Sequence, residues 1–126
     1  MGFLTVLKQD DSGGLQVKSA LDEASWIDVP PVPNTFVVNL GDCLERCTGG
    51  LLRATPHRVT KRVGTGVAGR CSYPFFFDPT FDARMVSYRH LLPPHLQQRA
   101  EARRARGIGK RFDGRNLDMY DGTYGD

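Results

Sequence analysis

Three side chains in this 126-residue chain are of types, and at a spacing, that could do chemistry together: His57, Arg70 and Ser72. In a β-strand, residues two apart point to the same face, so Arg70 and Ser72 would present a guanidinium and a hydroxyl to one ligand. That combination suits a carboxylate, which an arginine can hold through two hydrogen bonds while the hydroxyl donates to one of its oxygens. If His57 projects into the same cavity from the neighbouring strand, the site offers a metal ligand at one end and a carboxylate anchor at the other.

Each of these residues also has a purely structural interpretation. A single histidine in a strand is more often a hydrogen-bonded structural residue than a metal ligand. Arg70 could form a cross-strand salt bridge, and the aromatic run 75–77 is expected to form core and pocket wall. The other histidines, His90 and His95, are separated by Pro93-Pro94, so they are not expected to share a helical face or to act as replacement ligands.

The elements that must position these residues are mostly β-strands. Short runs of apolar, aromatic and β-branched residues recur about every 8 to 12 residues, with turn signals between them, which is typical of a β-sandwich or a jelly roll. The runs that we predict as strands are 3–7, 15–18, 26–29, 35–40, 57–62 and 70–77.

Turn and breaker residues add detail to this pattern. The cluster 10–14 predicts a hairpin between the first two strands, and 64–66 is interpreted as another hairpin loop. Pro74 indicates that the last strand lies at a sheet edge or contains a bulge. The nearly continuous apolar run 35–40 indicates a strand buried on both faces.

Two helices are predicted. One or two turns are expected at 43–47, with Asn39 and Asp42 serving a turn and the helix N-cap. A longer helix is expected at 95–106, because Pro93-Pro94 favours a helix start and Gly107 a helix end. The residues after it are rich in Gly and Asp and are expected to form loops.

Composition excludes several classes of function. The formal charge is +3, from 17 Lys and Arg against 14 Asp and Glu, which is too mild to indicate a nucleic-acid partner. The arginines of the segment 95–106 are expected to form a solvated helix face, because Glu101 interrupts them and no aromatic residues lie between them. No apolar run of about 18 residues indicates a membrane span. Three cysteines without CxxC spacing indicate ordinary thiols in a reducing, cytoplasmic compartment.

Several ordered segments carry a resemblance to a known family. They include Gly2 to Leu7, Asn39-Leu40-Gly41-Asp42, Thr55 to Val59 and Arg70 to Phe76, with the closing Tyr124-Gly125-Asp126. In this order they resemble the C-terminal core of the isopenicillin N synthase-like Fe(II)/2-oxoglutarate-dependent dioxygenases. The likeness runs over nearly all of residues 2–82 and resumes at the last few residues.

The resemblance implies a mainly β fold: a partial double-stranded β-helix, or jelly roll, lacking its N-terminal strands and followed by a C-terminal helix. Residues 1–90 would form the C-terminal portion of the jelly-roll domain and residues 91–126 its helical and loop tail. By the same resemblance, His57 would be one ligand of an Fe(II) ion, and Arg70 and Ser72 would bind the far carboxylate of the co-substrate 2-oxoglutarate. The family oxidises small organic molecules.

The family's other two iron ligands, a His-x-Asp pair, would fall immediately upstream of Met1. The chain alone is therefore expected to be inactive as an enzyme, with no catalytic residue of its own beyond the sites named above. The alternative is a non-catalytic remnant that binds a carboxylate metabolite or a protein partner.

Overall fold

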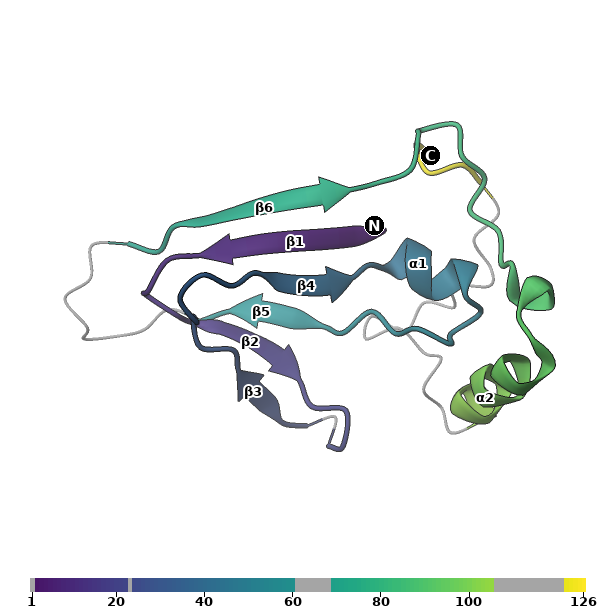
Figure 1. Ribbon diagram of the computed structural model, residues 1–126, viewed down its shortest axis with the longest axis horizontal. Coiled ribbons are helices and arrows are strands. Elements are labelled where there is room, and N and C mark those ends of the chain that lie inside the picture. Colours follow the sequence, from purple (N-terminus) through teal and green to yellow (C-terminus); the bar gives the residue numbers. More distant parts are fainter. Residues whose placement is uncertain (1, 23, 61–68, 106–121) are drawn as a thin grey trace.

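Two three-stranded antiparallel sheets form the body of the molecule in the computed structural model, which describes residues 2–22, 24–60, 69–105 and 122–126 (Figure 1). Sheet A has the strand order β4-β1-β6, and sheet B has the order β3-β2-β5. The mainly β class predicted from the alternation of strand and turn signals is confirmed. The strands are β1 (Leu4–Gln9), β2 (Leu15–Lys18), β3 (Trp26–Asp28), β4 (Val37–Leu40), β5 (His57–Val59) and β6 (Ser72–Phe77).

The predicted hairpin between the first two strands is wrong. β1 pairs with β4 and β6, whereas β2 pairs with β3 and β5. The turn between them carries the chain from one sheet to the other, with Gly13 at φ 71° and Gly14 at φ 87°. Both angles lie in the left-handed region, which glycine adopts without steric cost. Local turn signals locate such a turn but do not reveal which strands it joins. The loop predicted at 64–66 lies outside the described residues.

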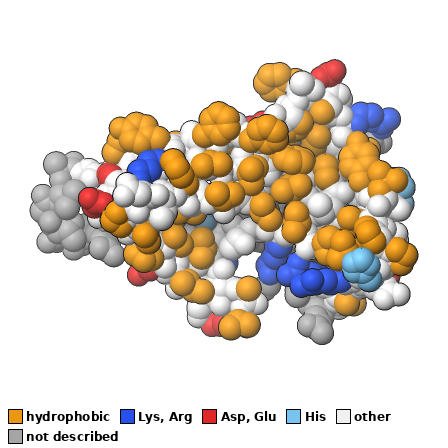
Figure 2. All heavy atoms as spheres, in the orientation of Figure 1, with side chains coloured by type: hydrophobic (Ala, Val, Ile, Leu, Met, Phe, Trp, Pro, Cys, Tyr) orange, Lys and Arg blue, Asp and Glu red, His pale blue; other side chains and the backbone are white. Residues whose placement is uncertain are grey.

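Sheet A has two different faces, which the pairing register defines. Thr5, Asn39 and Phe76 lie on the inner face, toward sheet B, because Thr5 pairs with both of the others. The outer face carries the apolar side chains of the alternate positions, among them Val38 and Phe75. These two are 57% and 64% exposed, and Figure 2 shows hydrophobic side chains gathered over β6, β1 and β4.

The expected burial of the strand 35–40 on both faces is therefore wrong within the described residues. β4 is an edge strand of sheet A, and its outer face is open. The edge position inferred for Pro74 is confirmed, because β6 forms the opposite edge of the same sheet. Of the aromatic run 75–77, Phe76 lines a cavity, but Phe75 and Phe77 are exposed on the outer face.

The face of sheet B that carries Gln16, at the positions alternate to His57, is polar by contrast. Gln16 connects its two neighbours: it donates to Asp28 at 2.9 Å and accepts from Arg58 Nε at 2.9 Å. The Trp26 ring lies between two cations, with Lys18 Nζ 4.8 Å and the Arg58 guanidinium carbon 4.1 Å from its centroid. The polar and charged side chains of this face thus contact one another through hydrogen bonds and cation–π interactions.

The short helix α1 (Asp42–Cys47) confirms the helical turns predicted at 43–47, but Asp42 is not its N-cap. Gly41 occupies the cap position and makes no side-chain cap bond. The backbone of the segment before β1 replaces the cap, because Cys43 N–H donates to the carbonyl of Gly2 at 3.1 Å. Asp42 instead lies in the first turn, where its negative charge is favourable at the helix N-terminus.

The helix α2 (Pro94–Ala105) follows the 3-10 turn η1 (Arg89–Leu91) and confirms the helix predicted from the Pro93-Pro94 start. Ala100 is fully buried, and Arg89 forms an ion pair with Glu101 at 3.8 Å. Arg106 lies outside the described residues. No helix in the described ranges is long and apolar enough to span a membrane.

The C-terminal residues 122–126 return to the end of β6 (Figure 1). Tyr124 N–H donates to the carbonyl of Ala83 at 2.9 Å, and Phe3 N–H donates to the Asp78 carboxylate at 3.0 Å. Burial, and then a hydrogen bond to that same carboxylate, raise the pKa of Tyr124 to about 12. Asp78 therefore joins the start of β1 to the C-terminal segment.

Replacing Tyr124 by Phe is expected to change how stability depends on alkaline pH. The tyrosine ionises at an ordinary pKa of 10.0 when the chain is unfolded and at about 12 when it is folded. Its contribution is thus complete below pH 10 and is lost as the pH rises toward 12. Urea unfolding in a series from neutral pH to about one pH unit above the ordinary tyrosine pKa should show a decline in the unmodified chain that is smaller in Tyr124→Phe. Equal declines in the two proteins would contradict the Asp78 contact.

Candidate functional site

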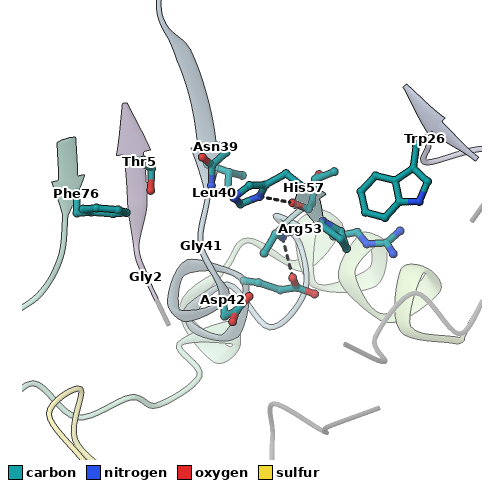
Figure 3. A pocket seen from close by; sticks show the side chains of 14 residues that line it. Gly2, Thr5, Trp26, Asn39, Leu40, Gly41, Asp42, Arg53, His57 and Phe76 are labelled. Atoms are coloured by element: carbon teal, nitrogen blue, oxygen red, sulfur yellow. Dashed lines mark hydrogen bonds between the residues drawn. The ribbon is translucent and has the colours of Figure 1, made fainter. Parts of the chain in front are cut away.

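A cavity of about 350 Å³ lies between the two sheets. Figure 3 shows Phe76, Thr5 and Asn39 on three adjacent strands of sheet A, with the His57 ring directed toward Asn39 from β5. The lining side chains thus come from both sheets, and of the three predicted site residues only His57 is among them. The lining residues are Gly2, Thr5, Trp26, Asn39, Leu40, Gly41, Asp42, Glu45, Arg53, Ala54, Thr55, Pro56, His57 and Phe76.

The His57 ring is oriented by its own local backbone. Nδ1 lies 3.2 Å from the carbonyl oxygen of Thr55. A carbonyl can only accept a hydrogen bond, so Nδ1 is the donor in this contact, and in the neutral ring the lone pair is then on Nε2. Fixing one ring nitrogen in this way is how proteins prepare the other nitrogen for a metal. His57 is exposed within the cavity, so Nε2 is accessible.

Arg70 and Ser72 are joined directly. Arg70 Nη1 donates to Ser72 Oγ at 2.8 Å, Nη2 donates to Gln9 Oε1 at 3.2 Å, and Nε donates to the carbonyl of Gly13 at 3.1 Å. The guanidinium is therefore held in one orientation by three neutral acceptors. Arg70 precedes β6, so the two residues are joined by this hydrogen bond and not by a shared strand face; their projection toward one ligand stays a prediction.

The end of β1 holds the segment that carries Arg70. Asp10 N–H donates to the carbonyl of Cys71 at 3.1 Å, and Cys71 N–H donates back to the Asp10 carboxylate. Hydrogen bonds from Ser12 and from the Cys71 backbone lower the pKa of Asp10, so this carboxylate stays ionised as an acceptor. The positive charge of nearby Arg70 is a further, smaller cause of the lowered pKa of Asp10.

The arginine–serine pair lies on the cavity side of sheet A but does not line the cavity. Ser72 pairs with Gln9, four residues along β1 from the Thr5–Phe76 pair. Residues four apart in a strand point to the same face, so Ser72 faces the same side as Phe76. The structure thus places His57 in the cavity and the Arg70–Ser72 pair at a distance along the same inner surface.

Acidic side chains at the cavity do not complete a metal site. Asp42 and Glu45 line it, but Glu45 Oε2 accepts a hydrogen bond from Ala54 N–H at 2.7 Å. Within the part of the chain that the structure describes, no group of three or more His, Cys, Asp and Glu side chains could hold a metal ion. Burial raises the pKa of the Cys43 and Cys47 thiols, which keeps them protonated and makes them poor ligands.

Sequence reasoning missed two cavity residues, Thr5 and Asn39. Asn39 was predicted to serve a turn, yet it lies in β4, paired with Thr5, and faces the cavity. The available signal was an amide inside a run of apolar and β-branched residues. A polar residue in such a strand is unusual unless it faces a site or has a hydrogen-bond partner.

Comparisons with known proteins bear on this geometry. Residues 1–79 match the family model of the 2OG-Fe(II) oxygenase superfamily. A probable iron/ascorbate oxidoreductase of Dictyostelium discoideum is 42% identical over 124 residues, which are 98% of this chain and 31% of the relative. The chain therefore spans about a third of the length of that curated relative.

Two solved structures resemble the chain. A full-length Neurospora crassa protein in complex with alpha-KG and thymine matches with a TM-score of 0.62 at 31% identity, over 80% of this chain and 34% of that one. JOX2 in complex with 2OG, Fe and JA matches with a TM-score of 0.62 at 33% identity, over 75% of this chain and 26% of that one.

Proposed function

The chain belongs to the 2OG-Fe(II) oxygenase superfamily, and from that premise we propose that it supplies one iron ligand, His57, and the oxoglutarate anchor, Arg70 and Ser72. Its two sheets are part of the jelly roll of that superfamily, whose members use Fe(II) and 2-oxoglutarate. The observation that carries the proposal is the shared inner surface, with an accessible imidazole nitrogen in the cavity and an oriented guanidinium–hydroxyl pair along the same sheet face.

The residues present fit oxoglutarate better than they fit a complete iron site. Arg70 can hold a carboxylate through charge-assisted hydrogen bonds, and Ser72 can donate its hydroxyl proton to one of the oxygens. His57 can supply one metal ligand through Nε2. A single imidazole binds metal weakly, because catalytic sites use three protein ligands. The remaining ligands, a His-x-Asp pair by family, would come from outside the described residues, so we expect no turnover from the 126-residue chain alone.

When bound, iron would supply the oxidising chemistry, in which dioxygen is the oxidant: one oxygen atom goes to the succinate formed as oxoglutarate loses CO2, and the other oxidises a C–H bond of the organic substrate. The contribution of this chain is positioning. Arg70 and Ser72 fix one end of the co-substrate. The apolar side chains between this anchor and the cavity, Leu7, Val37 and Pro74, exclude water from its carbon chain. His57 holds its Nε2 lone pair toward the cavity while Nδ1–H remains on the Thr55 carbonyl.

A second candidate function is non-catalytic binding of a carboxylate metabolite. It is favoured by the hydrogen bond between Arg70 and Ser72, which involves no candidate iron ligand. This function would appear as oxoglutarate binding to the chain that does not depend on Fe(II). If the chain bound a protein partner and not a metabolite, no oxoglutarate binding would be measured.

We propose a small organic molecule as substrate and a cytoplasmic location, with no nucleic-acid or membrane partner. The family acts on small organic molecules with oxoglutarate. The mild formal charge of +3 supports the proposal that no polyanion is a partner.

The test is a chimera in which this chain replaces the matched segment of the Neurospora crassa protein that was solved with alpha-KG and thymine, hereafter the Neurospora chimera. We expect Fe(II)-dependent consumption of oxoglutarate when thymine is present. Arg70→Ala should raise KM for oxoglutarate at least about 30-fold, as truncating one partner of a hydrogen-bonded charge pair does. Arg70→Lys should recover only part of the loss, because lysine lacks the planar fork.

The matched control is Arg99→Ala, since Arg99 is an exposed arginine of α2 that does not line the cavity. It should leave KM unchanged. If Arg70→Ala behaves like Arg99→Ala, the anchor role of Arg70 is wrong. If oxoglutarate binds without being consumed, and Fe(II) does not alter its affinity, the non-catalytic function is the better one.

A further inference from the structure

The inner face of sheet A presents three rows of side chains between the anchor and the cavity, and the strand register defines them. The first row pairs Gln9 with Ser72 beneath the Arg70 guanidinium. The third row is polar again, with Thr5 between Asn39 and Phe76, beside His57 (Figure 3). The middle row is apolar and consists of Leu7, Val37 and Pro74.

The third row offers hydrogen-bond donors that no other described side chain or backbone group uses. Asn39 and Thr5 both line the cavity and are half-buried, and within residues 2–22, 24–60, 69–105 and 122–126 neither side chain has a hydrogen-bond partner. The Asn39 amide can donate two hydrogen bonds and the Thr5 hydroxyl one. Half-buried polar groups without a protein partner are groups that a ligand can satisfy.

The spacing between the polar rows has the length of a particular ligand. Gln9 and Thr5 are four residues apart in β1, and a strand rises about 3.3 Å per residue, so the rows are about 13 Å apart. A five-carbon chain extends about 5 Å between its terminal carbons, given bonds of about 1.5 Å. Its terminal oxygens add about 1 Å at each end, and each hydrogen bond adds about 3 Å, which brings donors at the two ends to about 13 Å apart.

We propose that Asn39, assisted by Thr5, binds the oxo-acid end of the oxoglutarate whose far carboxylate is held by Arg70 and Ser72. This inference rests on the proposed function and adds to it a positioning residue. The oxo-acid end carries only hydrogen-bond acceptors, which match the donors of Asn39 and Thr5, and it would lie next to His57. The carbon chain between the two ends would lie over the apolar middle row.

The proposal can be tested on the ¹⁵N-labelled 126-residue chain by nuclear magnetic resonance titration with oxoglutarate and with butyrate. Butyrate has one carboxylate and an apolar chain, so it can occupy the anchor alone. Oxoglutarate should shift both the Arg70 Nε–H and the Asn39 side-chain amide signals, whereas butyrate should shift only the former. An Asn39 amide signal that stays unchanged at saturating oxoglutarate would overturn the proposal without any substitution.

Affinity measurements on variants give the second readout. Asn39→Ala should weaken oxoglutarate binding about tenfold and leave butyrate binding unchanged. The control Gln98→Ala removes an amide on α2 that does not line the cavity, and it should alter neither affinity. Equal oxoglutarate affinities of Asn39→Ala and the unmodified chain would overturn the Asn39 role while Arg70→Ala still tests the anchor. If neither ligand shifts Arg70, the proposed function itself has failed.

Discussion

Gly41→Ala is expected to destabilise the chain by about 3 kcal/mol or more, a large fraction of the stability of a small domain. A methyl carbon at this position would lie 1.9 Å from the carbonyl oxygen of Gly2 and 2.2 Å from its carbonyl carbon. Both atoms belong to the backbone, so a rotamer change cannot relieve the clash. The backbone angles are not the cause, because Gly41 has φ −94° and ψ 169°, which any residue adopts.

The clash would also break hydrogen bonds at the cavity. Gly41 N–H donates to the carbonyl of Phe3 at 2.9 Å, and Cys43 N–H donates to the carbonyl of Gly2 at 3.1 Å. Moving the two segments apart would lose both bonds and would displace the cavity wall that Gly2 and Gly41 form. Urea unfolding followed by circular dichroism measures the free energy of unfolding directly.

Gly69→Ala is the matched control. Gly69 is exposed, and a methyl carbon there would meet no atom of the described residues within 4 Å. Its effect is expected to stay within about 0.5 kcal/mol. Should the two alanine variants unfold at the same urea concentration, the close approach of Gly41 to Gly2 is not present in solution.

The contrast between these glycines shows what the sequence can and cannot predict. The strands and both helices follow from patterns of neighbouring residues, such as the apolar alternation of Leu15–Lys18, and they were predicted nearly within their observed bounds. Gly41 touches Gly2 because of a pairing between segments almost forty residues apart. No local pattern encodes that contact. For the same reason, the sheet change after β1 was mistaken for a hairpin.

The site residues divide in the same way. Arg70 and Ser72 are two apart in sequence, so strand geometry predicted that they would project together; Arg70 in fact precedes β6, and a hydrogen bond joins it to Ser72. Asn39 has only a weak local signal, an amide within an apolar run, which does not say what it faces. Its orientation toward the cavity depends on β4 pairing with β1, and its nearness to His57 depends on how the two sheets pack. Its role therefore became apparent only from the register.

The two sheets differ in the chemistry of their exposed faces. On the polar face of sheet B, Gln16 forms hydrogen bonds with side chains of both neighbouring strands. The outer face of sheet A instead leaves Val38, Phe75 and Phe77 more than half exposed. Exposed apolar patches of this kind mark surfaces that are covered in a larger assembly or that cause aggregation. The candidate site residues lie instead on the inner surface, between the two sheets. The role of His57, the remaining site residue, depends on its place in the cavity there.

His57→Ala in the Neurospora chimera is expected to abolish Fe(II)-dependent consumption of oxoglutarate, with a loss well beyond about 100-fold. Altering an outer partner of a metal ligand already costs about 10- to 100-fold in metal affinity or activity, so removal of the ligand itself should cost more. The physical basis is the Nε2 lone pair, which the Nδ1 contact with Thr55 leaves facing the cavity. Fe(II) affinity, measured by equilibrium dialysis, should fall together with turnover.

His95→Ala provides the comparison, because His95 is an exposed histidine on α2 that is absent from the cavity lining. It should leave iron affinity and turnover unchanged. Oxoglutarate binding in the absence of metal distinguishes loss of the iron ligand from loss of folding. A folded His57→Ala protein should still bind oxoglutarate through Arg70 and Ser72, whereas an unfolded one should not. A His57→Ala chimera that keeps its iron and its turnover would show that this imidazole is the ordinary structural histidine of the alternative interpretation, and the iron chemistry of the chain would have to be assigned elsewhere.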